Sequence, residues 1–391
     1  MDTVLVGLTL IAATSLLMLL VTHAATHRVL ARRILHGGSL PPISILKPLK
    51  GLDDGLAENL ASFARLDYPA FEILLGVPSR ADPAYAAACE VQRRYAHVAI
   101  RVVVCDRKLG RNPKVAVAAA LAEVAQHDAV LISDSNVRVR PDYLKDIGAE
   151  LADPRVGLVS NPIAGVGERT IGSLLENLQL ASFVLSSVCA ADALASHACV
   201  VGKSMLFRLS DLSRLGGFRA VRHVLAEDYV LGQKFQRAGF KVVLSPHAIQ
   251  TVNEGWRLSH FVERHLRWAQ MRRRLNAAAY FGEPLLNPTP WLLATLALTS
   301  GKPAALALIG LCVKAASDVL LLAKVRGAAI PAWKLPCIWL KDLLVLGIWA
   351  VGLFRQTLSW RGNHLRVARG SLLLPPPRPQ LGAQPALARA A

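Results

Sequence analysis

The sequence predicts an α/β domain that lies between transmembrane helices. Across residues 36–284, short apolar runs rich in β-branched residues alternate with amphipathic stretches, which is the pattern of strands and helices in α/β proteins. Long apolar segments with few charged residues precede and follow this region. Of the 391 residues, 53% are hydrophobic and 18% are charged. This composition is too apolar for a soluble single domain and too charged for a bundle buried wholly in lipid.

The first element is expected to be a membrane anchor. Residues 4–23 form an apolar run without a charged residue, long enough to cross a hydrocarbon core of ~30 Å. A cleaved signal peptide has positive charge before its apolar run, whereas here Arg28, Arg32 and Arg33 follow the run. We therefore expect an uncleaved anchor over residues 1–35. The positive-inside rule places the N-terminus outside and the following domain in the cytoplasm.

Within the domain, capping and turn residues separate the expected strands and helices. Asp82 and Asn112 each stand before a proline, as a helix N-cap does. Glu227 and Asp228 begin an acidic helix that Gly239 ends. The expected strands are residues 43–46, 71–77, 100–104, 129–133, 156–159, 199–207 and 241–244. The expected helices include residues 57–66, 83–95, 113–125 and 259–275.

The C-terminal membrane region, residues 285–355, contains three apolar segments, at residues 291–298, 304–323 and 335–354. The first is too short to span a bilayer unaided, so we expect it to be interfacial or re-entrant. The tail, residues 356–391, begins with basic residues that place it in the cytoplasm, so the number of crossings after the domain is even and we expect two. The Pro-rich end, from residue 374 onward, is expected to be disordered.

Four ionisable residues lie inside the last two segments. Lys314 stands four residues before Asp318, and Lys341 is next to Asp342. Charged side chains are costly in lipid. We therefore expect these side chains to face one another, a partner helix or water.

The formal net charge of +18 would also suit a protein that binds nucleic acid. The basic residues cluster beside the hydrophobic segments, however, as expected of a surface that lies on anionic lipid headgroups. No nucleic-acid recognition motif accompanies them, so we expect a lipid bilayer and no nucleic acid as partner. The six cysteines lack the paired spacing of zinc or redox sites and are expected to be reduced thiols.

Several polar residues suit the transfer of a sugar from a nucleoside diphosphate. Asp134 ends an apolar strand, where ligands bind in an open α/β sheet, and its carboxylate could hold a hard divalent cation, Mg²⁺ or Mn²⁺. Asp228 is the candidate general base. Arg264, Arg267 and Trp268 are spaced i, i+3 and i+4, so they share one helix face. The two guanidinium groups would suit a diphosphate.

Each of these residues also has a purely structural interpretation. Asp82 and Asn112 would serve as helix caps whether or not they contact a ligand. Asp228 could simply favour the helix dipole, and Arg264 and Arg267 could form a stripe that faces the lipid. All of them occur together on one α/β domain between membrane anchors, and this coincidence favours the catalytic interpretation.

Seven short motifs lie along the domain. They are Lys47-Pro48-Leu49-Lys50-Gly51, Leu66-Asp67-Tyr68-Pro69, Gly110-Arg111-Asn112-Pro113-Lys114, Asp134-Ser135, Gly202-Lys203-Ser204, Glu227-Asp228-Tyr229 and Arg264-His265-Leu266-Arg267-Trp268. Together they resemble the ceramide glucosyltransferases of glycosyltransferase family 21, over residues 41–284 and more weakly over residues 357–362. The resemblance implies a Rossmann-like GT-A domain, the fold of nucleotide-diphospho-sugar transferases. It also implies a bacterial, multi-pass protein of the inner membrane.

The resemblance further implies an inverting single displacement that moves glucose from UDP-glucose to the primary hydroxyl of ceramide, a membrane lipid. It places Asp82 and Asp134 at the nucleotide and a divalent metal ion, and it makes Asp228 the base. The arginine–tryptophan motif would contact the leaving diphosphate. Asn136 stands where an Asp-x-Asp pair would have its second carboxylate. The expected substrate-binding residues are Lys47, Asp82, Asn112, Lys114, Asp134, Gly202, Ser204 and Glu227, and Asp134 is the expected metal ligand.

Three other functions remain compatible with the sequence. A hopanoid glycosyltransferase that uses UDP-N-acetylglucosamine belongs to the same broad group, and the resemblance weakens over residues 165–198, where a lipid acceptor would lie. A processive polysaccharide synthase usually has Gln in place of Arg264 and more spanning helices. A non-catalytic membrane scaffold is disfavoured because the chain retains four candidate site residues together, Asp134, Asp228, Arg267 and Trp268. The sequence specifies no oligomeric state.

Overall fold

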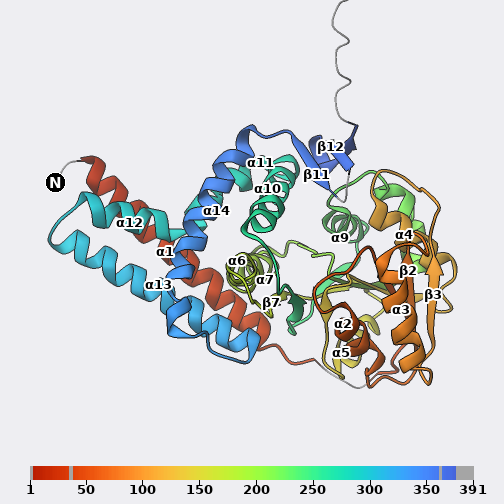
Figure 1. Ribbon diagram of the computed structural model, residues 1–391. Helices are drawn as coiled ribbons and strands as arrows, with labels where there is room; N and C mark the ends of the chain where they lie inside the picture. Colours follow the sequence, from red (N-terminus) through yellow and green to blue (C-terminus); the bar gives the residue numbers. More distant parts are fainter. Residues whose placement is uncertain (1–2, 35–37, 361–362, 376–391) are drawn as a thin grey trace, which may run out of the picture.

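The computed structural model describes residues 3–34, 38–360 and 363–375. In Figure 1 the α/β domain lies on the right and the long apolar helices lie together on the left. Helices α6 (Ile171–Gln179), α7 (Leu185–Ala195) and α10 (Leu258–Leu275) lie between the two groups (Figure 1). The predicted fold class, an α/β domain flanked by helices apolar enough to span a membrane, is confirmed.

Seven strands form the central sheet, in the order β3-β2-β1-β4-β8-β6-β9. Their bounds are β1 (Ile43–Pro48), β2 (Phe71–Val77), β3 (Ile100–Val104), β4 (Ala129–Ser133), β6 (Val156–Ser160), β8 (Ser204–Arg208) and β9 (Lys241–Leu244). The first four strands pair in parallel, whereas β8 is antiparallel to both β4 and β6. β1, β4 and β6 are buried along their whole length, as expected of strands that are covered on both faces.

Helices cover both faces of this sheet. On one face, Ile45, Leu131 and their neighbours pack against α2, α3 and α5. On the other face, Leu46, Val130 and Phe207 pack against α4, α8 and α9. The bounds of these helices are α2 (Leu56–Ala64), α3 (Pro83–Arg94), α4 (Pro113–Glu123), α5 (Tyr143–Leu151), α8 (Leu209–Arg214) and α9 (Glu227–Arg237).

The two predicted N-caps are confirmed. The Asp82 carboxylate accepts a hydrogen bond from the amide of Ala84, and Asn112 Oδ1 accepts from the amides of Lys114 and Val115. Each cap satisfies backbone donors that the first turn of a helix leaves unpaired. These two side chains therefore fix the starting points of α3 and α4.

The predicted strands are confirmed with one correction. The strand expected over residues 199–207 begins only at Ser204, and the residues before it form a loop. The loop departs from the sheet because the backbone groups of Gly202 bond to side chains instead of to a neighbouring strand. This loop lies at the same edge of the sheet as the end of β4, because Ser204 pairs with Ser133.

A smaller sheet connects the domain to the apolar helices. It contains β5 (Val137–Arg138), β10 (Ile249–Val252) and β7 (Ile163–Val166), in that order. β10 leads to α10, and β7 leads to α6. Helix α6 continues through a π-helical turn (Leu180–Val184) into α7. A π turn inside a helix often marks a functional site.

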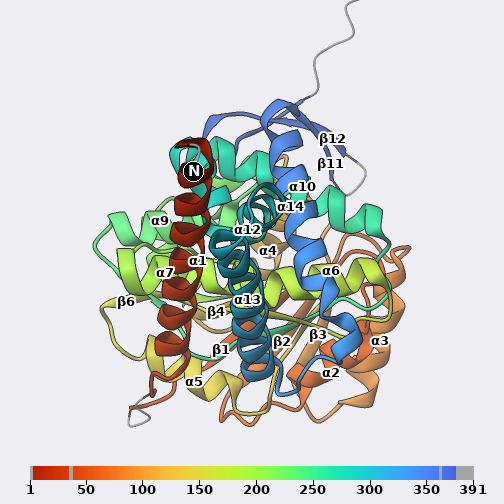
Figure 2. The same ribbon diagram turned by 90° about the vertical axis from the view of Figure 1, so that its left-hand side faces the viewer.

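Within the described residues, four helical segments are long and apolar enough to cross a membrane. They are α1 (Thr3–Leu30), Ile171–Ala195, α13 (Lys302–Arg326) and Ala332–Phe354, which includes α14 (Pro336–Phe354). The segment predicted not to span unaided is the short helix α12 (Pro288–Leu298). The sequence interpretation did not include Ile171–Ala195. In Figure 2 this segment, formed by α6 and α7, runs across α1 and α13 instead of alongside them.

We call the helix formed by α6 and α7 the crossing helix, because it runs across α1 and α13. Its polar side chains are turned into the protein. Glu176 and Asn177 in α6, Ser182 in the π turn and Ser186 in α7 are all buried. A lipid environment would leave such groups without partners. The helix therefore presents a polar seam to the domain and to α14, and this seam breaks the apolar run that a spanning segment would show in the sequence.

The four ionisable residues of the C-terminal segments meet in one buried cluster. Lys314 Nζ lies 2.8 Å from Asp318 Oδ2 and also contacts Asp342. Lys341 Nζ lies 2.7 Å from Asp342 Oδ1. His23 of α1 joins the cluster, since its Nε2 lies 3.7 Å from Asp318 Oδ1. The prediction that these charges face one another is confirmed, and the cluster links α1, α13 and α14.

The last described residues form a third sheet. Its strands are β11 (Thr357–Trp360), β12 (Asn363–Val367) and β13 (Leu373–Leu374), paired in antiparallel order. The end predicted to be disordered begins at residue 374, but Leu374 lies in β13 and pairs with β12. Residues 376–391 of that end lie outside the described residues. The remaining short helices are Phe218–Val221, Ala277–Gly282 (α11), Glu283–Leu286, Ala332–Lys334 and Arg369–Ser371.

Candidate active site

Three carboxylates gather around one lysine beyond the end of β4. Asp134 follows β4 directly, and Glu227 and Asp228 begin α9. Lys114 Nζ lies 2.8 Å from Asp134 Oδ1 and 3.2 Å from Glu227 Oε1. Although burial opposes the charged form, the three carboxylates raise the pKa of Lys114 above its ordinary value. The lysine is therefore charged and holds the end of β4 against the start of α9.

Lys203 supplies a second ammonium group to Asp134. Its Nζ lies 2.9 Å from Asp134 Oδ2 and donates to Asn136 Oδ1 at 2.6 Å. Burial of the Asp134 carboxylate would raise its pKa, but Lys114 and Lys203 together hold the pKa of Asp134 well below its usual range. Sequence reasoning quoted the motif that contains Lys203 but did not assign this residue a role.

Asp228 is held by two backbone amides. Its Oδ2 accepts from Gly202 at 2.6 Å, and its Oδ1 accepts from Tyr229 at 2.8 Å. Burial raises the pKa of Asp228, against the effect of Lys114 and of these two hydrogen bonds. A fixed carboxylate with a raised pKa, at the open end of an α/β sheet, has the properties of a general base.

The backbone of Gly202 lies very close to the side chains of Asp228 and Lys114. A Cβ atom at this position would lie 2.8 Å from Asp228 Oδ2 and 2.9 Å from Lys114 Nζ, nearer than real Cβ contacts. The carbonyl of Gly202 also accepts from Lys114 Nζ at 2.8 Å. One residue of the loop before β8 thus touches both the candidate base and the central lysine.

Three of the expected substrate-binding residues are fully buried, and they bond to residues around the site. Lys47 Nζ donates to the backbone oxygen of Asp134 at 2.8 Å and lies 3.7 Å from the centre of the Phe63 ring. Asn112 Nδ2 donates to Glu227 Oε2 at 3.0 Å. Ser204 bonds within the core to Tyr143 and Asn161. These contacts give the three residues a structural role, and their expected contact with substrate stays a prediction.

Asp82 lies in the turn between β2 and α3. Besides capping α3, its Oδ1 accepts from the amide of Gly51 at 2.8 Å. Gly51 has a positive φ of 68°, which suits a glycine. The capping interpretation is therefore confirmed, and the expected contact of Asp82 with a nucleotide stays a prediction.

The arginine–tryptophan motif lies on α10. The guanidinium of Arg264 lies 4.6 Å from the centre of the Trp268 ring and 5.2 Å from that of Trp256. Its Nη1 lies 3.1 Å from Glu176 Oε1, and the side chain is 9% exposed. Arg264 is therefore fixed between two rings and a carboxylate. Any contact of Arg264 with a diphosphate would be made from this fixed position. Arg267 lies one turn further along the helix, where its side chain is partly exposed.

Glu176 is a second residue that sequence reasoning missed. Its side chain is fully buried in α6, where it pairs with Arg264 and with His265, whose Nε2 lies 2.8 Å from Glu176 Oε2. The only sequence signal is an acidic residue inside a segment rich in Leu, Ala and Ser. Such a residue is rare in an apolar helix and points to a buried cationic partner.

Replacing Glu176 with Gln is expected to lower kcat/KM about tenfold, the effect of losing one charge-assisted hydrogen bond. The amide keeps the shape of the side chain but removes the charge that holds the Arg264 guanidinium against its two rings. Steady-state kinetics on the purified protein would measure this. Glu254→Gln is the matched control, because Glu254 pairs with Arg169, whose side chain is 77% exposed. Equal activities of the two variants would show that Glu176 does not position the arginine.

The donor atoms at Asp134 fit a hard divalent cation that arrives with a nucleotide. Mg²⁺ commonly uses one or two carboxylates and completes its coordination with substrate phosphates. Within the described residues, no group of three or more His, Cys, Asp or Glu side chains is arranged to hold a metal by itself. Both oxygens of Asp134 contact lysine ammonium groups. A bound diphosphate could take over these contacts with the lysines and leave the Asp134 oxygens to the cation. The expectation of Asp134 as the protein's metal ligand is therefore compatible with its surroundings.

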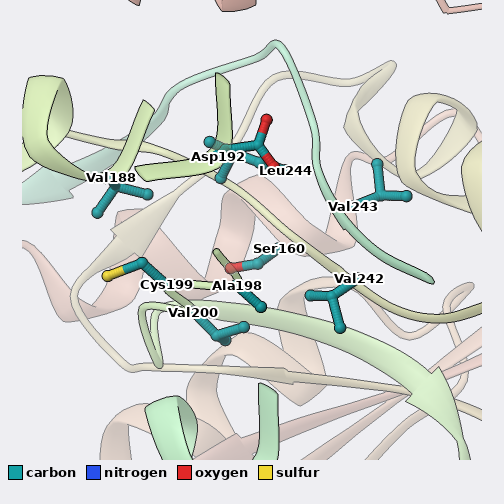
Figure 3. A pocket seen from close by; sticks show the side chains of 9 residues that line it. All are labelled: Ser160, Val188, Asp192, Ala198, Cys199, Val200, Val242, Val243 and Leu244. Carbon is teal, nitrogen blue, oxygen red and sulfur yellow. The ribbon is translucent and has the colours of Figure 1, made fainter. Parts of the chain in front are cut away.

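A small hollow lies apart from these residues, between the end of α7 and the strands β6 and β9 (Figure 3). Most of its lining is apolar, and its polar side chains are Ser160, Asp192 and Cys199. Burial raises the pKa of the Cys199 thiol to about 11, so the sulfur is protonated near neutral pH. None of the residues around Lys114 lines this hollow.

The fold is shared with a known glycosyltransferase. A mannosyltransferase from Pyrobaculum calidifontis, solved with GDP-Man and Mn²⁺, superimposes with a TM-score of 0.51 at 19% sequence identity. The match covers 89% of this chain and 99% of the mannosyltransferase chain. At this identity the likeness shows the fold alone, which is the GT-A arrangement predicted from the sequence.

Curated relatives and a family profile agree with one another. Ceramide glucosyltransferase 3 of Caenorhabditis elegans is 24% identical over 362 residues, which are 89% of this chain and 77% of the relative. The ceramide glucosyltransferase of Komagataella phaffii is 27% identical over 298 residues, which are 62% of this chain and 58% of the relative. The profile of the family described as Glycosyl transferase family 21 matches residues 7–373. The chain therefore belongs to glycosyl transferase family 21 and is a sugar-nucleotide-dependent glycosyltransferase.

Proposed function

We propose that this protein transfers glucose from UDP-glucose to the primary hydroxyl of ceramide, with inversion at the anomeric carbon. The observation that supports this most is the fixed carboxylate of Asp228, held by the amides of Gly202 and Tyr229 beside the Lys114 cluster. The similarity to ceramide glucosyltransferases of other organisms supports the choice of donor and acceptor. The protein would act at the cytoplasmic face of a bacterial inner membrane.

In this proposal Asp228 removes the proton from the acceptor hydroxyl. The hydroxyl oxygen attacks the anomeric carbon as the bond to the diphosphate breaks, and UDP leaves with the bonding electrons. The proton remains on Asp228 until solvent removes it. The raised pKa of Asp228 brings its basicity closer to working pH than that of an exposed aspartate. Proton removal by a placed carboxylate contributes about 10²- to 10⁴-fold to a rate.

The leaving diphosphate would lie against cationic groups from three parts of the chain. Lys114 and Lys203 surround Asp134, and the Arg267 guanidinium comes from α10. Burial, together with the charge of Arg264 on α10, lowers the pKa of the Lys203 ammonium group. A divalent cation held at Asp134, Mg²⁺ or Mn²⁺, would neutralise negative charge on the diphosphate.

The lipid acceptor would reach the base from the side of the apolar helices. Helix α10 begins after β10 and packs against α14 and α6, so the arginine–tryptophan motif lies where the domain meets these helices (Figure 1). The crossing helix of α6 and α7 has its polar seam in the same region. A ceramide tail could stay in the bilayer while its hydroxyl approaches from the membrane, between the anchor helices and α10.

The proposed function is tested by transfer from radiolabelled UDP-glucose and UDP-N-acetylglucosamine, with ceramide or a polyhydroxylated hopanoid as acceptor. The full-length protein is used in purified membranes, and Asp228→Asn is the control. Glucosylceramide that forms only with an intact Asp228 supports the proposal. If product forms only with UDP-N-acetylglucosamine or only with the hopanoid, that substrate would replace UDP-glucose or ceramide in the proposal. Absence of transfer to any lipid would reject lipid glycosylation altogether.

Replacing Arg267 with Lys is expected to lower kcat/KM for the donor about tenfold, as for the loss of one charge-assisted hydrogen bond. A lysine keeps the charge, but a single ammonium group cannot donate the paired hydrogen bonds of a guanidinium to a diphosphate. Initial rates over a range of donor concentrations would measure this. Arg274→Lys, in the last turn of the same helix, is the control. Normal kinetics of Arg267→Lys would remove this residue from diphosphate binding.

A further inference from the structure

The third sheet follows the last membrane helix in the sequence, and the chain between its last two strands contacts the residues just before the candidate base, Asp228. The amide of Leu225 donates to the backbone oxygen of Ser371 at 2.8 Å, and the amide of Ala226 donates to Ser371 Oγ at 3.1 Å. Leu373 donates from its amide to the oxygen of His223 at 2.7 Å. A segment almost 150 residues away in sequence thus binds the chain immediately before Glu227, where α9 begins.

Ser371 adopts a conformation that serine rarely takes. Its φ is 61°, in the left-handed region, and its side chain is fully buried. Ser196 is the only other non-glycine residue with a positive φ in the described part of the chain. A left-handed non-glycine residue persists only when its surroundings hold it there. At Ser371 the holding contacts are the two hydrogen bonds from Leu225 and Ala226.

The same sheet also contacts α10. Leu365, Val367 and Leu373 form a buried apolar cluster with Leu225, and Met271 of α10 packs against it. The side chain of Gln270, next to Met271, donates to the backbone oxygen of Thr357 at 3.3 Å. The sheet therefore contacts both the chain before Glu227 and Asp228 and the helix that contains Arg264 and Arg267.

The start of α9 depends on this contact because it has no side-chain cap. Ala226 is the N-cap residue, and the side chain of an alanine cannot accept hydrogen bonds from the first turn. The orientation of the Ala226 peptide sets the direction in which Glu227 and Asp228 leave the backbone. The amide of Ala226 donates to Ser371 Oγ, and two residues later the Asp228 carboxylate accepts from the amide of Gly202.

We propose that Ser371 is a positioning residue for the transferase reaction. Its carbonyl and its hydroxyl hold the amides of Leu225 and Ala226, so that the Asp228 carboxylate meets the amide of Gly202 and faces the acceptor hydroxyl. This inference rests on the proposed role of Asp228 as the base. It adds a residue outside the catalytic domain predicted from the sequence, from a sheet that directly follows the last membrane helix.

The test is hydrogen exchange of the full-length protein in detergent, followed at the amides of Ala226 and Gly202. Ser371→Ala removes the Oγ acceptor, and Ser196→Ala is the matched control, because Ser196 is an exposed serine with the same left-handed backbone, φ 48°. We expect Ser371→Ala to speed exchange about tenfold at Ala226, which loses its acceptor, and also at Gly202, which Ser371 does not touch. Ser196→Ala is expected to change neither.

Kinetics give the second part of the test. Ser371→Ala is expected to lower kcat about tenfold with the donor KM unchanged, because the base is displaced while the diphosphate contacts remain. Faster exchange at Ala226 with no change at Gly202 would overturn the inference, since the base would then be held without Ser371. An unchanged kcat would overturn it as well. Failure of the proposed function would be recognised separately, by wild-type protein that transfers no glucose although exchange at Gly202 responds to Ser371→Ala.

Discussion

Replacing Asp228 with Asn is expected to lower kcat by about 10²- to 10⁴-fold while leaving UDP affinity nearly unchanged. Asparagine has the same shape and keeps one oxygen that can accept from the amide of Gly202. It cannot take a proton from the acceptor hydroxyl. The groups proposed to contact the diphosphate, Lys114, Lys203 and Arg267, are unaltered. Single-turnover rates and UDP titration of the same preparation would separate the two effects.

Glu227→Gln is the comparison for this substitution. Glu227 is the neighbouring carboxylate, and it contacts Lys114 and Asn112 instead of the amide of Gly202. If Glu227 only supports the site, its variant retains much more activity than Asp228→Asn. Equal losses of UDP binding and turnover in Asp228→Asn would make Asp228 a structural residue and would reject it as the base.

The pH dependence of the wild-type protein offers an independent check on the base. Asp228 must be ionised to accept a proton, and burial raises its pKa. As pH falls through this raised pKa, the base becomes protonated and kcat/KM declines. The acid limb of the profile should therefore lie above the pH at which an exposed aspartate titrates, about 3.9. An acid limb at the ordinary aspartate value would contradict the assignment.

Replacing Lys314 with Met is expected to destabilise the protein by about 3–5 kcal/mol, the usual cost of removing one partner from a buried ion pair. Lys314 contacts both Asp318 and Asp342, and its side chain is 2% exposed. Methionine fills a similar volume but leaves Asp318 without its lysine partner. Chemical denaturation in detergent would show the loss as a lower midpoint.

Lys324→Met is the control for this measurement. Lys324 lies in the last turn of the same helix and is exposed, so its replacement removes a charge without breaking a buried contact. We expect a change in stability within about 0.5 kcal/mol, as for other surface substitutions. If Lys314→Met were as stable as Lys324→Met, the charged cluster would make no net contribution to holding α1, α13 and α14 together.

Local sequence patterns predicted the elements of the domain and the position of its acidic residues. Asp82 and Asn112 could be recognised as caps because a cap, the following proline and the helix are contiguous in sequence. Asp134 and Asp228 could be recognised because each stands at the end or the start of a predicted element. The order of these elements predicted an α/β domain, and the family resemblance predicted that it has the GT-A fold.

The contacts that complete the site could not be read in this way. Glu176 meets Arg264 from 88 positions away, and Ser371 meets Ala226 from 145 positions away. No periodicity reports such pairs, because they depend on how α6, α10 and the third sheet pack. Lys47 and Ser204 show the opposite difficulty. Their motifs were identified, but only the packed structure shows that both side chains point into the core.

The charged cluster of the membrane helices also bears on how the chain enters the bilayer. Lys314 and Asp318 lie in one segment and Lys341 and Asp342 in the next, and each such residue raises the free energy of insertion by about 2.5–3.5 kcal/mol at the centre of a helix. Lys314 finds Asp342 only when both segments are present. During synthesis, α13 would therefore be poorly retained in lipid until α14 follows it, so the two helices should integrate as a hairpin against the α1 that is already in place.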